Sequence, residues 1–115
     1  MKKQNIRMVV YEAIGRFIAA YKQNDMETLL SKYGLDEENI AEIDSFLDFV
    51  EDKSKIHLFP ISDIDKNDLL SIDKVGGDYL IECILTYEDT DFYLVCEYNK
   101  MENDRYGFEY RCFDI

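Results

Sequence analysis

The sequence predicts an α+β fold: three N-terminal helices packed on one face of a C-terminal antiparallel meander sheet of four to five strands. The first half, residues 1–52, has apolar residues at three- and four-residue spacing, which is typical of amphipathic helices. The second half, residues 55–115, has short runs rich in β-branched and aromatic residues between polar turns, which is typical of strands. The chain has 115 residues and changes pattern once, so we expect a single domain with its helices on one side of the sheet.

Three helices are expected in the first half. Residues 4–22 carry a broad apolar stripe, formed by Ile6, Val10, Ala13, Ile14, Phe17, Ile18 and Tyr21. Asn24 followed by Glu27 has the form of a capping pair, so a second, short helix is expected to begin there and to end at Gly34. Asp36 is expected to cap a third helix, whose apolar stripe is Ile40, Ile43, Phe46, Leu47 and Val50.

The second half is predicted to contain up to five strands. Residues 55–61 include the only proline, which suits an edge strand. Residues 69–75 are predicted to pair with the strand that follows Gly76-Gly77, because glycine readily adopts the positive φ of a two-residue hairpin turn. The longest strands are expected on either side of a turn at Asp89-Thr90, and residues 106–115 are expected to form the last strand after a turn near Asn103-Asp104.

A two-residue turn at Asp89-Thr90 would set the pairing of the two long strands. It would place Cys83 opposite Cys96, Leu85 opposite Leu94, Ile81 opposite Tyr98 and Glu82 opposite Glu97. Strand alternation then predicts one apolar face for the helices to cover, and a slip of one residue would turn that face outward. The residues expected on this inner face are Tyr79, Ile81, Cys83, Leu85, Tyr87, Phe92, Leu94, Cys96, Tyr98, Phe108, Tyr110 and Cys112.

The opposite face is expected to mix acidic and apolar residues. Its predicted members are Glu82, Ile84, Thr86, Tyr93, Val95, Glu97, Glu109, Arg111 and Phe113. Glu82 and Glu97 would repel each other directly across the strands, and either Arg111 or a basic partner would offset that cost. Apolar residues among the charges favour an interaction surface, with a plain solvated face or a homodimer interface as the alternatives.

The charge of the chain excludes some partners. A net charge of −12 argues against nucleic acid and anionic membranes, which need clustered Lys and Arg, and favours a basic protein. The first 34 residues run against this trend, with six Lys or Arg against three acids. No export signal or membrane-length apolar run is expected, so a reducing cytoplasm is the expected location. Cys83, Cys96 and Cys112 are therefore expected to be buried free thiols, with a Cys83–Cys96 bond as the alternative.

No catalytic, cofactor or metal residue is predicted. The segment 63–68 resembles the start of a calcium loop, but Asp68 stands where that loop needs glycine and Lys74 where it needs glutamate. His57 is the sole histidine, and a packed or half-exposed side chain is the ordinary state in its apolar surroundings. Zinc is not expected, because the chain has one histidine and no short-spaced cysteine pair. A Glu82–Glu97 acid-base pair would need opposed environments that the sequence does not indicate.

Residues 9–30 read VVYEAIGRFIAAYKQNDMETLL, a long helix that ends in a polar residue plus Asp25 before a short helix begins. This order resembles the nuclear transport factor two-like superfamily, a cystatin-like α+β roll, and residues 106–115 look like its final strand. The resemblance implies a function among the pocket enzymes, small-ligand binders and interaction modules of that superfamily. Residues 33–36 depart from it, since they leave no room for the strand usually found between the second and third helices, and no pocket residue is carried over.

Small acidic α+β proteins without catalytic residues also look like bacterial immunity proteins, which neutralise toxins that are often basic nucleases. The leading hypothesis is a non-enzymatic acidic protein-binding module, with an immunity protein against a basic toxin as its specific form. Its expected contact residues are Glu82, Tyr93, Glu97, Glu109, Arg111, Asp89, Asp91, Glu102 and Asp104. The alternative is a small-ligand-binding or enzymatic pocket between helices and sheet, with His57 or tyrosine hydroxyls as its polar groups.

Overall fold

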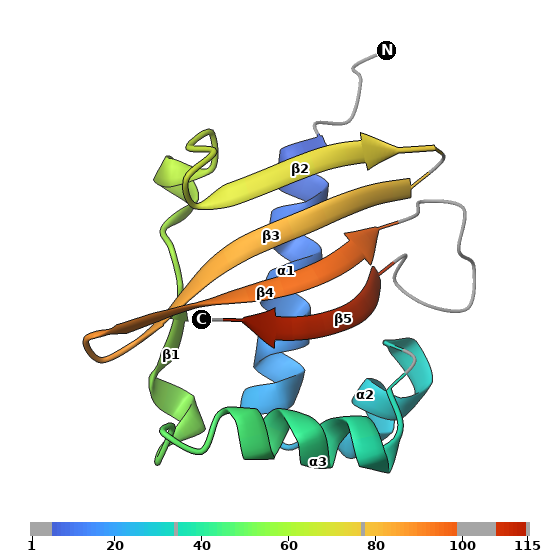
Figure 1. Ribbon diagram of the computed structural model, residues 1–115, viewed down its shortest axis with the longest axis vertical. Helices are drawn as coiled ribbons and strands as arrows, with labels where there is room; N and C mark the ends of the chain where they lie inside the picture. The colour runs from blue at the N-terminus through green and yellow to red at the C-terminus, as the bar shows by residue number, and fades with distance from the viewer. Residues whose placement is uncertain (1–5, 34, 77, 99–107, 115) are drawn as a thin grey trace.

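A computed structural model describes residues 6–33, 35–76, 78–98 and 108–114 (Figure 1). Three helices come first, followed by a sheet of five strands, which confirms the predicted α+β class. The helices are α1 (Ile6–Lys22), α2 (Met26–Lys32) and α3 (Glu37–Phe46). The strands are β1 (Ile56–Leu58), β2 (Leu70–Val75), β3 (Asp78–Tyr87), β4 (Thr90–Tyr98) and β5 (Phe108–Asp114), with 3-10 turns η1 (Lys53–Lys55) and η2 (Ile61–Asp63) beside β1.

The sheet is antiparallel, in the order β1-β3-β4-β5, and β2 also pairs with β3. β1 and β2 share one edge of β3: β2 pairs with its first half and β1 with residues 85–87. α1 crosses behind the strands, and α2 and α3 lie at one end of the sheet (Figure 1). Among the described residues, no helix lies in front of the strands in this view, so one face of the sheet is covered and the other is open.

The core lies between α1 and the covered face of the sheet. The predicted stripe of α1 is buried from Val10 to Tyr21, and Phe17 at its centre stacks on Tyr110 of β5 with ring centroids 6.0 Å apart. The inner faces of β3 and β4 are buried as predicted: Ile81, Cys83, Leu85, Tyr87, Phe92, Leu94 and Cys96. Within the described residues no charged side chain is buried in this interior, and its buried tyrosines include Tyr21, Tyr33 and Tyr87.

The hairpin register differs from the predicted one by two residues. Tyr87 pairs with Thr90, so the turn consists of Glu88, with a φ of 52°, and Asp89. Thr90 prefers the strand, because a β-branched residue is disfavoured at positive φ. The predicted pairs are therefore wrong: Cys83 faces Leu94, Leu85 faces Phe92, Ile81 faces Cys96, Glu82 faces Val95 and Glu97 faces Leu80. A shift of two keeps every side chain on its predicted face.

A bulge in the β4–β5 pairing changes the end of β5. Cys96 pairs with Tyr110, whereas the preceding residue Val95 pairs with Cys112, so β5 contains one extra residue. An extra residue inverts the alternation beyond it. Phe113 is consequently buried and Cys112 exposed, the reverse of the predicted arrangement.

The helix ends differ from the predictions in two places. The N-cap of α2 is Asp25 rather than Asn24, and its carboxylate accepts hydrogen bonds from the amide and hydroxyl of Thr28 at 3.3 and 2.8 Å. Asp36 caps α3 as predicted, in a capping box with Asn39. Phe46 is exposed instead of buried, because α3 ends there and the chain turns to bury Leu47.

Candidate binding face

The open face of the sheet carries most of the predicted contact residues. Strand pairing places acidic side chains from four strands on it, and we call this set the outer-face acids: Asp73, Asp78, Glu82, Asp91, Glu97, Glu109 and Asp114. Apolar side chains alternate with them along β3 and β4. Leu80, Ile84 and Val95 are partly exposed, and Tyr93 is 37% exposed. The result is an acidic surface with apolar patches between the charges.

Glu97 faces a second acid and also forms an ion pair. It lies opposite Leu80 on β3 and opposite Glu109 on β5, so the like-charge pair is Glu97–Glu109 rather than Glu82–Glu97. Arg111 Nε donates to Glu97 Oε2 at 2.7 Å, and its Nη2 contacts the same oxygen. Arg111 thus offsets the repulsion, as expected, although for a different pair. Since its side chain is 54% exposed, this ion pair contributes less than about 1 kcal/mol.

The remaining predicted contact residues lie at the margins or outside the described residues. Asp89 is exposed in the β3–β4 turn, and Asp91 follows it at the start of β4. Both lie at the opposite end of β4 from Glu97. Glu102 and Asp104 lie outside the described residues. Asp73 was missed, although the alternation of β2 would have placed it on the same face as Glu82.

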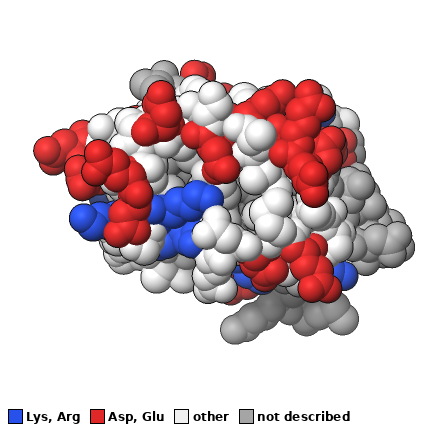
Figure 2. Space-filling model, turned by 90° about the horizontal axis from the view of Figure 1, so that it is seen from below, with Lys and Arg blue, Asp and Glu red and all other residues white. Residues whose placement is uncertain are grey.

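Acidic side chains are not confined to the sheet. Figure 2 shows the α2–α3 end of the molecule, where they form separate groups around a smaller basic one. The first turn of α3 supplies Glu37 and Glu38, which the positive end of the helix dipole stabilises. The negative field is therefore broad. Exposed apolar side chains also occur at this end, at Met26, Leu30 and Phe46, and the outer face differs in presenting them on strands rather than on helices.

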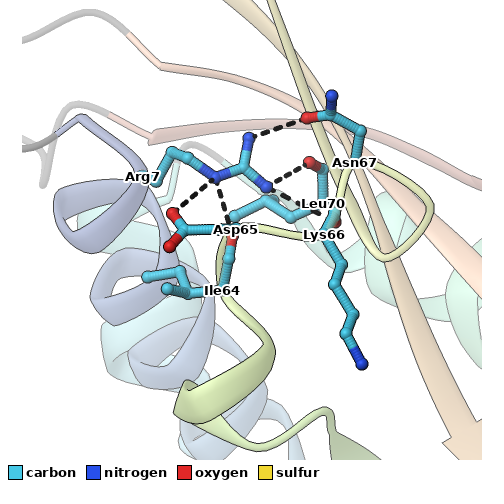
Figure 3. Close-up of polar contacts among 6 residues, drawn as sticks. All are labelled: Arg7, Ile64, Asp65, Lys66, Asn67 and Leu70. Carbon is cyan, nitrogen blue, oxygen red and sulfur yellow. Dashed lines mark hydrogen bonds and ion pairs between the residues drawn. The ribbon is translucent and has the colours of Figure 1, made fainter.

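The calcium-like segment has a structural role. Arg7 of α1 reaches into the loop between β1 and β2, where its Nε donates to Ile64 O at 2.6 Å and its Nη2 to Leu70 O at 2.8 Å (Figure 3). Its Nη1 donates to the side chain of Asn67 at 3.1 Å. Lys66 Nζ forms an ion pair with Asp63 Oδ1 at 3.0 Å. A guanidinium therefore fills the centre of the loop, and the described residues contain no cluster of three metal-ligating side chains.

His57 lies beside a groove between α1 and β1. The groove has a volume of about 390 Å³ and is lined by Gly15, Ile18, Ala19, Lys22, Gln23, Ser54, Ile56, His57 and Leu58. Lys22 Nζ donates to Ile56 O at 2.9 Å across it. Gly15 sits in the middle of α1, where glycine costs about 1 kcal/mol relative to alanine, and a Cβ there would meet no atom within 4 Å. This groove is distinct from the apolar interior in which the alternative hypothesis expected a pocket.

One tyrosine and two cysteines of the core are held in their neutral, protonated forms. Burial and the hydrogen bond to Asp44 raise the pKa of Tyr21, whose hydroxyl donates to Asp44 Oδ1 at 2.8 Å and links α1 to α3. Burial raises the pKa of Cys83 to about 12 and that of Cys96 well above its ordinary value. All three cysteines are free, as expected. Buried groups held in their neutral forms are poor nucleophiles and proton acceptors.

No protein-family model, curated protein or solved structure matches this chain. Within the described residues, no helix has the length and apolar character needed to cross a membrane.

Proposed function

We propose that this protein is a non-enzymatic acidic binding module that recognises a basic protein surface through the outer face of its sheet. The observation that carries the proposal is the alternation of outer-face acids with exposed apolar side chains on a surface that no described element covers. Charge complementarity indicates the kind of partner. The outer-face acids outnumber the basic residue Arg111, so this face is complementary to a surface that carries Lys and Arg.

Binding would proceed in two stages. The net charge of −12 attracts a basic partner over a distance and accelerates encounter, an effect that salt weakens. Tyr93 then supplies an anchor between β3 and β5, where it pairs with Ile84 on one side and with Asp114 on the other. Tyrosine suits this place because its ring buries a large apolar area while its hydroxyl remains hydrated.

The specific form that we propose is an immunity protein that neutralises a basic toxin. It is supported by the small acidic α+β fold and by the acidic side chains of the outer face. The resemblance of residues 9–30 to the nuclear transport factor two-like superfamily is compatible with this proposal, since that superfamily includes interaction modules.

The test compares two baits of equal charge. Glu82→Lys with Glu109→Lys reverses two exposed acids on the outer face, and Glu42→Lys with Asp48→Lys reverses two exposed acids on the α3 side. Glu97 is left unchanged because it holds Arg111. Quantitative mass spectrometry of proteins retained from the source cell should show a basic protein that binds the wild type and the α3 variant but not the outer-face variant. Equal retention by both variants would exclude the outer face.

Two further measurements sharpen this result. Sedimentation of the purified chain should show a monomer, whereas a dimer abolished by the outer-face variant would assign that face to self-association. If the retained protein is a nuclease, one equivalent of wild-type chain should suppress its activity, and the outer-face variant should not. A nuclease that stays fully active when bound would refute the immunity role while leaving the binding role intact.

A further inference from the structure

The groove between α1 and β1 differs in charge from the rest of the molecule. Although the chain has a net charge of −12, no aspartate or glutamate lines this groove, and its ionisable lining residues are Lys22 and His57. Asp52 lies next to it along the chain, but its carboxylate accepts hydrogen bonds from the amide and hydroxyl of Ser54 at 3.0 and 2.6 Å. A groove lined by a lysine and by no carboxylate is complementary to an anion.

Lys22 is held in position for such a ligand. Its ammonium group donates to Ile56 O at 2.9 Å and is part-buried, and an ammonium carries three donors. Among the described residues, no carboxylate forms an ion pair with it. The remaining N–H groups are therefore available to a second acceptor. The hydrogen bond to Ile56 O of β1 already holds the ammonium group in place.

Gly15 is not explained by the fold. It lies inside α1, where glycine is destabilising, yet a Cβ at this position would meet no atom within 4 Å and its φ is not positive. Neither a tight turn nor a close contact requires glycine here. Its missing side chain does have one consequence, which is to leave room in the groove that it lines.

We propose that this groove binds a small organic anion. The apolar part of the ligand would lie against Ile18, Ala19 and Leu58, and its carboxylate or phosphate would accept hydrogen bonds from Lys22, with His57 beside it. The volume of about 390 Å³ is in the range of ordinary ligand sites and suits a molecule with one ring or a short chain. This site is separate from the outer face and does not depend on the proposed protein partner.

Titration of the full chain, followed by amide chemical shifts, tests the proposal with three probes of similar size. Phenyl phosphate and phenylacetate carry the two candidate anions, and phenethylamine is the matched cation. Shifts should centre on Gly15, Ala19 and Ser54, and at least one anion should bind at least tenfold more tightly than the amine. A preference between the two anions identifies the headgroup. Equal binding of the amine, no binding of either anion, or shifts located elsewhere would overturn the proposal.

Two variants and one control complete the test. Gly15→Leu should fill the groove and abolish anion binding without lowering the melting temperature. Lys22→Met should weaken binding at least tenfold, whereas Lys32→Met, an exposed lysine of α2 outside the groove, should leave it unchanged. If Lys22→Met does not fold, Gly15→Leu decides the matter. Unchanged binding of the preferred anion in the Gly15→Leu variant would refute the site.

Discussion

The two faces of the same strands follow opposite rules. Phe92 is fully buried under the helices, whereas the next residue, Tyr93, is 37% exposed on the outer face. Inner-face residues are apolar and gain stability by leaving water, while the outer-face acids stay hydrated and interact through charge. The contrast indicates that the stabilising core and the proposed binding surface lie on opposite faces of a single sheet, so mutations on the inner face should mainly change stability and mutations on the outer face should mainly change binding.

The largest expected difference between the faces concerns the thiols. Cys112 is exposed, so iodoacetamide should alkylate it at the rate of an ordinary free thiol. Cys83 and Cys96 are buried with raised pKa values and should react only when the domain opens, at least about a thousandfold more slowly. Mass spectrometry of a native labelling time course measures both rates. Labelling of all three thiols at one rate would contradict the separation of faces.

Truncation of neighbouring aromatic residues should separate the faces thermodynamically. Phe92→Ala leaves a cavity in the core and should lower the free energy of unfolding by about 3–5 kcal/mol. Tyr93→Ala removes an outward cross-strand contact with Ile84 and should cost less than about 1 kcal/mol. Urea unfolding followed by circular dichroism gives both values. Similar losses for the two variants would show that the outer face is part of the folding core.

Arg7 tests whether the loop between β1 and β2 depends on the helix layer. Arg7→Ala leaves the carbonyls of Ile64 and Leu70 without their donor and should cost roughly 1–3 kcal/mol. Arg7→Lys should restore only part of the lost stability, because an ammonium group cannot donate to several acceptors in the planar geometry of a guanidinium. Urea unfolding measures the loss, and hydrogen exchange of residues 64–70 should accelerate. Lys32→Ala is the control, and a loss no greater than in this control would contradict the structural role.

The smallest expected effect on stability concerns the like-charge pair Glu97–Glu109. Glu109 faces Glu97 across β4 and β5, so Glu109→Gln should relieve repulsion and raise the free energy of unfolding by about 0.2–1 kcal/mol. The gain should shrink with added salt because the site is exposed. The same change should weaken association with the proposed basic partner. Glu42→Gln on α3 is the matched control, and a loss of stability in Glu109→Gln would show that the pair is not repulsive.

Local signals were sufficient for the architecture and for most of the outer face. Helical spacing predicted the buried stripe of α1, and strand alternation assigned Glu82, Tyr93, Glu97 and Glu109 to the open side. These predictions hold because the periods of helix and strand depend on the local backbone alone. Even the two-residue error in register left the faces intact, since a shift by one full strand period preserves them.

Other features required the tertiary structure. The bulge that exposes Cys112 and buries Phe113 depends on how β5 packs against β4 and the helices. No residue type in β5 predicts its position. The hydrogen bonds of Arg7 to Ile64 and Leu70 join segments about 60 positions apart. The register that places Glu97 opposite Leu80 rather than Glu82 depends on contacts between two strands that both pack on the helices. The sequence by itself thus determined the elements and their faces, because these follow from the period of the backbone. Only tertiary packing decided which atoms meet, because that depends on register and on contacts between distant segments.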